Sequence, residues 1–305
     1  MPACSIEVEH FTRKYGDFYA VSDVSFAVEE GSVFAFLGPN GAGKSTTINT
    51  LCTIQEKSGG ELRINGNDVT KQKALVRKDI GIVFQDTTLD GKLTVKENLR
   101  LHCDFYKVPK TEVNNRVDFV MDLVDIAELR NAPVAALSGG QKRRVEIARG
   151  LVHFPRVLFL DEPTTGLDPQ TRTNVWEYIN RLQKQENITI FLTTHYMDEA
   201  EICHKVAIID HGKIVAHDTP YNLKKRYTST TMKIRTADAS LIGEYCAGRS
   251  LRTCRDGEGI TVFSTDANQV LDIVTLFKSS IDDIEITKGT LNDVFIAITG
   301  KEIRN

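Results

Sequence analysis

The chain has 305 residues, of which 41% are hydrophobic and 26% are charged, and its formal net charge at pH 7 is -3. This composition is that of a globular protein with one or two buried cores, and it argues against an intrinsically disordered chain. The slight negative charge also argues against a general nucleic-acid binder, which is usually basic.

Six cysteines are present, and none of them forms a C-x-x-C pair that would indicate a zinc or redox site. We therefore expect reduced thiols in a cytosolic protein. The stretch from Met1 to Phe18 lacks an apolar signal region, and the longest apolar runs, such as Val33 to Leu37, are far too short to cross a bilayer. Such a protein would serve a membrane only from the water side, through a partner.

The first elements in chain order are predicted to be strands at residues 5–12, Val24–Val28 and Ser32–Leu37. The third is short and almost continuously apolar, which is typical of a strand buried in a parallel sheet. A glycine-rich segment at 38–43 follows, and a helix is predicted to begin at Lys44. A buried strand, a glycine loop and a helix in this order form the context that a phosphate-binding loop requires.

Residues Gly38 to Ser45 match the pattern G-x-x-x-x-G-K-[ST]. Glycines allow backbone N–H groups to surround phosphate oxygens, and the following helix adds the positive end of its dipole. Lys44 can reach the β- and γ-phosphates, and the Ser45 hydroxyl can hold Mg²⁺. The alternative is a glycine-rich turn without a ligand. The residues predicted to bind nucleotide here are Gly38, Pro39, Asn40, Gly41, Ala42, Gly43, Lys44, Ser45 and Thr46.

Another short strand is predicted at Ile80–Phe84, followed by a helical insert at about residues 87–155. Within the insert, Ser138, Gly139 and Gly140 precede a helix and form a second possible anion site at its N-terminus. The alternative is an ordinary helix cap. A single chain does not need two such sites for one nucleotide, so the second one points to a nucleotide bound to another copy.

A buried strand is predicted at Arg156–Leu160, and two carboxylates, Asp161 and Glu162, follow it directly. Beside a phosphate loop, Asp161 can organise Mg²⁺ and its waters, and Glu162 can orient and deprotonate an attacking water. Taken alone, an acidic pair after an apolar strand is often only the polar end of the strand. A helix and another buried strand are predicted next, at about Arg172–Gln185 and Ile188–Leu192.

The last third of the chain is predicted to contain a hairpin at Val206–Ala216 and then a polar linker at Tyr227–Thr231. The linker separates a main domain at 1–227 from a small domain at 230–305. The small domain has the pattern β-α-β-β-α-β, which is the ferredoxin-like order, followed by one more helix. Two roles remain open for it: regulating or steadying a dimer, and passively covering one edge of the main domain.

The segment Leu137–Gln141 reads LSGGQ, and Val157–Pro169 reads VLFLDEPTTGLDP. Together with the glycine loop, these motifs resemble the ATP-binding subunits of ABC transporters, and the resemblance covers roughly residues 5–225. It implies an α/β fold, in which a P-loop NTPase core with a parallel sheet carries an antiparallel β subdomain and the helical insert, joined here to the small C-terminal α+β domain. It also implies ATP and Mg²⁺ as cofactors. Subunits of that family pair head to tail and hold each ATP between the glycine loop of one copy and the LSGGQ segment of the other.

The resemblance assigns roles to four further positions. Tyr15 matches the aromatic residue that stacks on adenine, and Gln85 matches the glutamine that reaches Mg²⁺ and the attacking water. Asp168 matches the loop that bridges the two copies, and His195 matches the histidine that contacts the γ-phosphate. Each has a plainer alternative, namely an ordinary aromatic, a solvated glutamine, an Asp-Pro turn and an idle histidine. The expected groups are catalytic (Lys44, Gln85, Glu162, His195), metal-binding (Ser45, Gln85, Asp161) and, toward the nucleotide of the second copy, Ser138, Gly139, Gly140, Gln141 and Asp168.

The segments Thr194–Ala200 and Thr290–Gly300 resemble those of drug-resistance-type exporter ATPases. The expected function is therefore the ATP-hydrolysing motor subunit of an exporter for drug-like or lipid-like compounds. Its expected partners are a second copy or a paired ATPase subunit, and an integral membrane permease docked at about residues 87–101. The expected location is the cytoplasmic face of the membrane, as a peripheral subunit, and no nucleic-acid partner is expected.

The alternative is a soluble ATPase of the same superfamily that acts on nucleic acid or ribosomes. The DNA-repair and chromosome-organising members insert long coiled coils or zinc modules, whereas the insert here has neither heptads nor a C-x-x-C. Ribosome-acting members usually carry two ATP cassettes, and this chain has one. The basic run Lys142–Arg144 is interpreted as a solvated helix face rather than as a phosphate or lipid contact.

Overall fold

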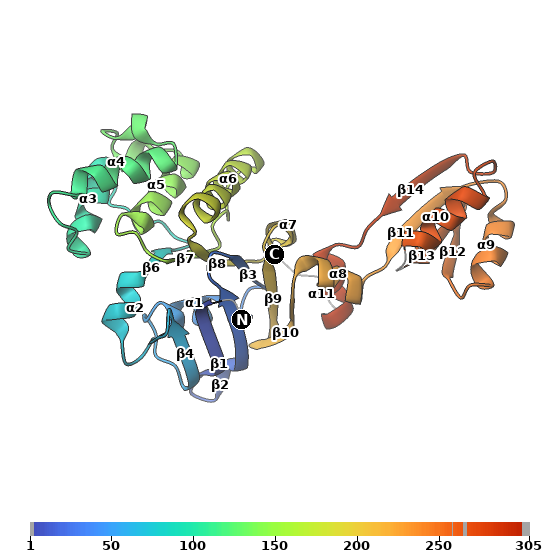
Figure 1. The fold of residues 1–305 in the computed structure, drawn as a ribbon, viewed down its shortest axis with the longest axis horizontal. Helices are drawn as coiled ribbons and strands as arrows, with labels where there is room; N and C mark the ends of the chain where they lie inside the picture. The colour runs from blue at the N-terminus through green and yellow to red at the C-terminus, as the bar shows by residue number, and fades with distance from the viewer. Residues whose placement is uncertain (1–2, 258, 265–266, 301–305) are drawn as a thin grey trace. The chain divides into compact units, whose positions relative to one another are not determined.

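The computed structural model describes residues 3–257, 259–264 and 267–300, and Figure 1 shows their fold. The chain forms two compact units, the first ending at His217 and the second beginning at Asp218. In the part of the chain that is described, no helix combines the length and the apolar character needed to cross a bilayer.

A six-stranded sheet forms the centre of the first unit, and its neighbouring strands β3, β8, β7 and β6 run parallel. β3, β7 and β8 are buried along their whole length, as their continuous apolar sequences predict. In this sheet the carboxyl ends of parallel neighbours meet at one edge, where polar residues can be brought together. Across the sheet the strands are β10 (Lys213–Asp218), β9 (Lys205–Asp210), β3 (Val33–Leu37), β8 (Thr189–Thr194), β7 (Val157–Asp161) and β6 (Ile80–Val83).

A second, antiparallel sheet covers the central one. Its strands, in spatial order, are β2 (Phe18–Glu29), β1 (Cys4–Tyr15), β4 (Gly59–Ile64) and β5 (Asn67–Asp68). One hydrophobic cluster joins the two sheets, and the Phe26 ring stacks on those of Phe34 and Phe191 at centroid distances of 5.5 and 6.0 Å. Stacked aromatic rings of this kind bury large apolar areas, so they lock the two sheets together.

The helices of the first unit fall into those that follow strands and those of the insert. α3, α4 and α5 of the insert pack on one another, as Figure 1 shows. A capping box at Thr94, in which Thr94 and Glu97 bond each other's backbone, fixes the start of α3. The helices are α1 (Lys44–Leu51), α2 (Lys73–Asp79), α3 (Val95–Phe105), α4 (Val113–Leu123), α5 (Gly139–Leu151), α6 (Pro169–Glu186) and α7 (Met197–Glu201).

The second unit contains a four-stranded antiparallel sheet with strand order β12-β13-β11-β14. This order, with a helix after β11 and after β13, is the ferredoxin-like arrangement that the sequence predicts. The unit begins ahead of the predicted boundary at residue 227 because α8 packs against α11. Its elements are α8 (Pro220–Tyr227), β11 (Thr230–Arg235), α9 (Ala239–Ala247), β12 (Arg252–Asp256), β13 (Gly259–Ser264), α10 (Ala267–Leu276), β14 (Asp283–Thr287) and α11 (Leu291–Thr299).

Two histidines lie where the insert meets the central sheet. The His153 ring stacks on the Tyr106 ring at a centroid distance of 3.6 Å, and its Nε2 donates to the Ile80 carbonyl at 2.9 Å. Burial lowers the pKa of His153 to about 4. Burial, together with the nearby positive charge of Arg149, also lowers the pKa of His102 to about 4. Both imidazoles are therefore neutral in the folded protein at pH 7.

These two histidines predict a loss of stability in acid. An unfolded histidine titrates near pH 6.5, so between that pH and about 4 the unfolded chain binds protons that the folded chain does not. The free energy of unfolding should therefore fall as the pH falls through this window. His153→Phe keeps a ring over Tyr106 but removes one titrating group, so the fall measured by urea denaturation between pH 7 and pH 5 should become shallower. His211→Phe, at an exposed position, is the control variant. If the dependence of the unfolding free energy on pH were unchanged in His153→Phe, buried His153 would not be a source of the acid sensitivity.

Candidate functional site

The glycine loop connects β3 to α1 and contains two residues with positive φ angles, a conformation that favours glycine. Gly41 and Gly43 have φ angles of 79° and 107°. A Cβ on Gly43 would lie 2.6 Å from the Ala20 carbonyl oxygen, so no larger residue fits there. The Gly38 N–H donates to the Thr194 carbonyl at 3.2 Å, which ties the loop to the end of β8. The loop is thus held against the carboxyl edge of the central sheet, with the N-terminus of α1 behind it.

Lys44, the first residue of α1, is buried and lies across this loop. Its Nζ donates to the carbonyls of Gly38 and Pro39 at 2.7 and 3.2 Å, and it lies 3.3 Å from Glu162 Oε1. Burial lowers the pKa of Lys44, and the carboxylates of Glu162 and Asp161 act in the opposite direction. The ammonium group is therefore stabilised in a largely desolvated place mainly by Glu162 and two carbonyls.

The pKa values of the two carboxylates at the end of β7 shift in opposite directions. Burial raises the pKa of Asp161, although the Thr193 hydroxyl donates to its carboxylate and favours the charged form. Burial would also raise the pKa of Glu162, but Lys44 and then His195 outweigh it, so that this pKa is lowered. Glu162 has a left-handed backbone with φ of 45°, and its N–H donates to the Thr193 carbonyl at 3.1 Å. This turn carries an ionised carboxylate away from the strand.

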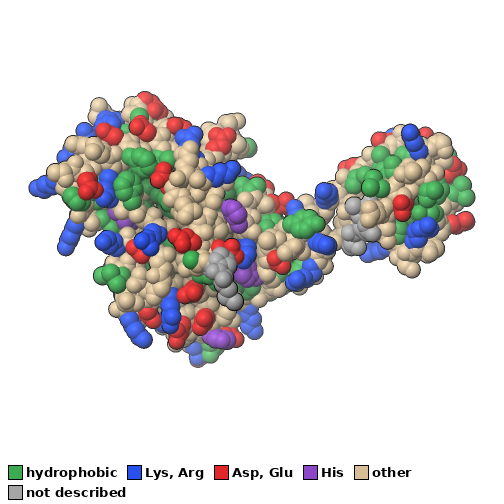
Figure 2. Space-filling model, in the orientation of Figure 1, with side chains coloured by type: hydrophobic (Ala, Val, Ile, Leu, Met, Phe, Trp, Pro, Cys, Tyr) green, Lys and Arg blue, Asp and Glu red, His purple; other side chains and the backbone are tan. Residues whose placement is uncertain are grey.

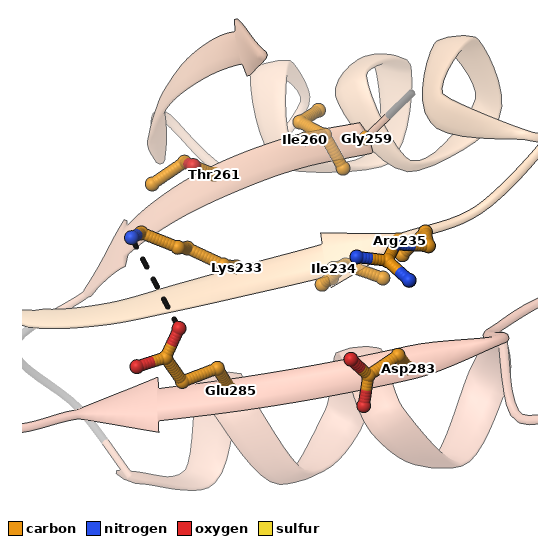
Figure 3. A pocket seen from close by; sticks show the side chains of 8 residues that line it. All are labelled: Lys233, Ile234, Arg235, Gly259, Ile260, Thr261, Asp283 and Glu285. Carbon is orange, nitrogen blue, oxygen red and sulfur yellow. Dashed lines mark ion pairs between the residues drawn. The ribbon is translucent and has the colours of Figure 1, made fainter. Parts of the chain in front are cut away.

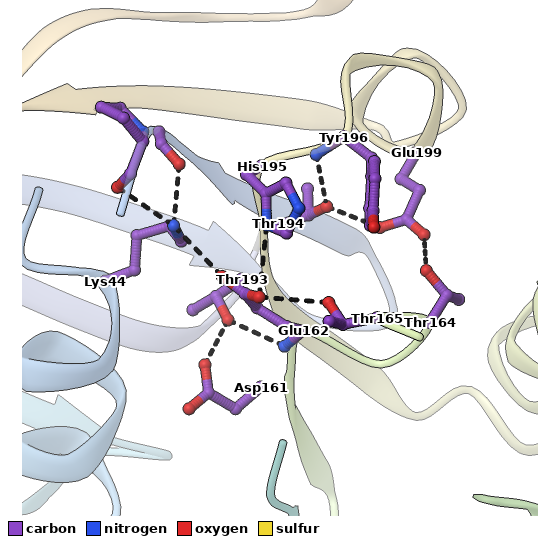
Figure 4. A network of polar contacts seen from close by, with 12 residues as sticks. Lys44, Asp161, Glu162, Thr164, Thr165, Thr193, Thr194, His195, Tyr196 and Glu199 are labelled. Carbon is purple, nitrogen blue, oxygen red and sulfur yellow. Dashed lines mark hydrogen bonds and ion pairs between the residues drawn. The ribbon is translucent and has the colours of Figure 1, made fainter. Parts of the chain in front are cut away.

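His195 completes the surroundings of Glu162, as Figure 4 shows. It follows β8 directly, and its Nδ1 lies 3.2 Å from Glu162 Oε2. The Thr165 hydroxyl donates to the same carboxylate oxygen at 3.1 Å. The structure thus brings together three predicted site residues, Lys44, Glu162 and His195. Lys44 begins the helix after β3, and the other two directly follow β7 and β8.

A buried glutamate that the sequence did not single out supports this arrangement. Glu199, at the start of α7, accepts from the Thr194 hydroxyl at 2.6 Å and from the Thr164 hydroxyl (Figure 4). Burial raises the pKa of Glu199, and the two hydroxyls favour its charged form. These bonds join the loop after Glu162 to the segment that presents His195. In the sequence, Glu199 is marked only as an acidic residue a few positions after the apolar strand Ile188–Leu192.

The residues predicted to hold Mg²⁺ offer the hard oxygen atoms that this ion prefers. A hydrogen bond from the Ser45 hydroxyl favours the charged form of Asp161, so these two side chains lie together. Gln85 is exposed and follows β6, which pairs in parallel with β7, so it lies at the same edge of the sheet as Asp161. The donor set therefore fits a magnesium ion.

The predicted second anion site is a capped helix end. The Gln141 N–H donates to the Ser138 hydroxyl at 3.3 Å, and the Ser138 N–H donates to Gln141 Oε1 at 2.9 Å. A Cβ on Gly140 would lie 2.4 Å from Thr171 Cγ2, so glycine is needed where α5 meets α6. Asp168 caps α6 by accepting from the Thr171 N–H at 3.0 Å. Ser138, Gly140 and Thr171 line one small hollow of about 70 Å³, next to the loop of Asp168.

Tyr15 lies at the end of β1, and 43% of its surface is exposed. The Arg13 guanidinium lies over its ring at 4.4 Å from the centroid, and its hydroxyl donates to Gln55 Oε1 at 2.7 Å. These two contacts hold the ring in one orientation, with the Arg13 guanidinium over one of its faces.

The interpretation of the basic run at 142–144 as a solvated face is wrong for Arg143, which is 6% exposed. Its guanidinium donates to the carbonyls of Phe84, Asp161 and Pro163, and it lies 3.1 Å from Glu146. Burial lowers the pKa of Arg143, and Glu146 offsets part of that effect. Arg143 thus holds the helix that begins after Ser138 to the segments before Gln85 and around Glu162. A planar guanidinium has five N–H donors in a fixed fork, so it can serve these three carbonyls and the Glu146 carboxylate at once.

Arg143→Met should therefore lower both stability and ATP hydrolysis. It leaves Glu146 buried without its partner and three carbonyls without a donor, at a cost of about 3–5 kcal/mol. Thermal unfolding and steady-state ATPase assays measure the two effects. Arg144→Gln, which removes a more exposed arginine from the same helix, is the matched control and should change both much less. Equal behaviour of the two variants would show that the Arg143 contacts are unimportant.

Comparisons with known proteins point to one family. Residues 21–165 match the family described as ABC transporter. The chain is 32% identical over 309 residues to Nod factor export ATP-binding protein I of Ralstonia nicotianae, covering 98% of this chain and 95% of that protein. It is 33% identical over 309 residues to the daunorubicin/doxorubicin resistance ATP-binding protein DrrA of Streptomyces peucetius, covering 98% and 93%.

A solved structure is similar as well. It is the dimeric structure of the ATP-binding cassette MJ0796 in a post-hydrolysis state, bound to ADP and Pi. It matches with a TM-score of 0.63 and 27% identity over 70% of this chain and 98% of that one. The relatives are aligned over nearly the whole chain, and the glycine loop, Lys44, Glu162 and His195 lie together in the structure. The protein therefore belongs to the ATP-binding subunits of ABC transporters and is an ATPase.

Proposed function

We propose that this ATPase is the motor subunit of an exporter for drug-like or lipid-like compounds. The observation that carries the motor function is the ionised Glu162, held between Lys44 and His195 beside the glycine loop. The exporter assignment is supported by relatives named for Nod factor export and for daunorubicin/doxorubicin resistance, which are similar over both units of the chain.

In the proposed reaction, water attacks the γ-phosphoryl group of ATP. Glu162 accepts a proton from this water, and His195 contacts the γ-phosphate. Lys44 is proposed to turn from Glu162 toward the phosphates, because a phosphate offers more negative charge to a buried ammonium group than one carboxylate does. Tyr15 is proposed to stack on adenine. Mg²⁺, held by Ser45, Asp161 and Gln85, would neutralise phosphate charge as it develops.

Two copies are proposed to close head to tail around ATP. The capped helix end at Ser138, Gly139, Gly140 and Gln141 would contact the γ-phosphate bound by the other copy, and the Asp168 loop would bridge the pair. ATP then favours the closed pair only through contacts that the open pair lacks, and hydrolysis removes them. We propose that a membrane permease, docked at about residues 87–101, follows this movement and that the subunit lies on the cytoplasmic face.

Glu162→Gln tests the catalytic base. The amide cannot accept the proton, so ATP hydrolysis should fall by about 100-fold or more, while ATP still binds. The variant should accumulate as an ATP-bound pair, measured by size-exclusion chromatography with and without ATP. Glu177→Gln, an exposed position on α6, is the control and should leave turnover unchanged. Normal turnover in Glu162→Gln would overturn the assignment of the base.

The membrane partner has its own test. Affinity purification from detergent-solubilised membranes should recover the chain with an integral membrane protein. Exposed apolar side chains near the proposed dock, Leu101 and Phe105, should matter for this, so replacing both with Ser should release the partner without lowering basal ATPase activity. ATPase activity that rises with added nucleic acid, and no recovered membrane protein, would instead identify a soluble ATPase.

A further inference from the structure

One face of the sheet in the second unit is covered by helices and the other is open. Met232 and Ile234 of β11 and Ile260 and Val262 of β13 point into the hydrophobic cluster formed with α9 and α10. Side chains alternate along a strand, so their neighbours point the other way. We call this side the open face and define it by Lys233, Arg235, Thr261, Asp283 and Glu285, all of which line one shallow cavity of about 350 Å³ (Figure 3).

The charges on the open face are sorted by strand. β11 contributes Lys233 and Arg235, and the adjacent edge strand β14 contributes Glu285 and Asp283. Each cation is directly opposite an anion, Lys233 opposite Glu285 and Arg235 opposite Asp283. A column of two positive charges thus lies beside a column of two negative charges.

The pairs within one sheet leave these charges only partly satisfied. Lys233 Nζ lies 4.0 Å from Glu285 Oε2, and the two side chains are 60% and 68% exposed (Figure 3). An exposed pair at this distance contributes little to stability. Both columns therefore remain available to charges brought from outside.

A second copy of this chain has the matching pattern. Consider a two-fold axis that runs parallel to the strands and lies over the boundary between β11 and β14. The rotation places the positive column of each copy over the negative column of the other. Lys233 and Glu285 of the two copies then form a ring of four charges of alternating sign around the axis. Arg235 and Asp283 form a second such ring two residues further along the strands. Such an isologous contact closes after two copies.

The sheet edge at β14 does not offer this match. This edge strand carries Asp283 and Glu285, so an antiparallel pairing of two β14 strands brings negative charges together. Like charges on neighbouring strands destabilise the pairing. For a two-fold contact, charge therefore favours the open face over this edge.

We propose that the open face is a contact between two copies of the chain, through which the second units pair without nucleotide. This goes beyond the ATP-dependent closure of the first units and uses none of its residues. Each contact is two-fold, so when the two axes coincide the pairing of the second units adds to the same closed dimer. It would keep the two ATPase subunits together after hydrolysis.

Two complementary charge reversals test this contact in the full chain. Lys233→Glu with Arg235→Glu makes both columns negative, and Asp283→Lys with Glu285→Lys makes both positive. In sedimentation velocity without nucleotide and at low salt, each variant alone should self-associate about tenfold or more weakly than the wild-type chain, because like charges now face each other. An equal mixture of the two variants should associate again.

The control changes as much charge elsewhere in the second unit: Lys225→Glu with Lys278→Glu, both exposed and off the open face, should associate as the wild type does. Unchanged self-association of both reversal variants, or a mixture that stays monomeric, would overturn the proposal. Each reversal is also placed in the Glu162→Gln background. ATP-dependent pairing should survive there, so a failure of the open-face contact is distinguishable from a failure of the ATP-driven motor.

Discussion

The site depends on one buried ion pair, in which Lys44 and Glu162 neutralise each other at 3.3 Å. Neither charge could be buried alone, because an unpaired ion in a protein interior costs several kcal/mol, roughly the whole stability margin of a domain. The pair forms because β3, β8 and β7 are neighbours, so that residues distant in sequence reach one edge. A bound phosphate can compete for the same ammonium group, which connects nucleotide binding to the freedom of Glu162.

Other buried charges hold the segments around this pair. Glu199 bonds the threonines on both sides of the site, and Arg143 bonds the backbone before Gln85 and at the end of β7. In the proposed pair, α5 faces the nucleotide of the other copy, whereas Glu162 and Gln85 face the copy's own nucleotide. In that proposed pair, Arg143 would connect the two ATP sites through side-chain hydrogen bonds rather than through a flexible loop.

Much of this could be predicted from the sequence where the determinants are local. The strand, glycine loop and helix around Lys44 follow from adjacent residues, and the β-α-β-β-α-β order follows from short apolar runs. Arg143 could not be predicted, because its partners are carbonyls far along the chain and a basic run on a helix is usually solvated. The contact of α8 with α11, which moves the unit boundary to Asp218, is also nonlocal. The roles of the site residues in binding nucleotide, holding the metal and catalysing hydrolysis stay predictions, those of Tyr15 and Asp168 included.

The left-handed backbone of Glu162 is a local strain that the site itself compensates. A side chain with a Cβ costs roughly 1–2 kcal/mol in that conformation, and glycine would avoid this cost. Glycine there would leave the Lys44 ammonium buried without its carboxylate, however, and an unpaired buried charge costs more than the torsion does. The residue proposed as the base is thus also the one that the buried lysine requires, so folding and turnover favour glutamate at the same position.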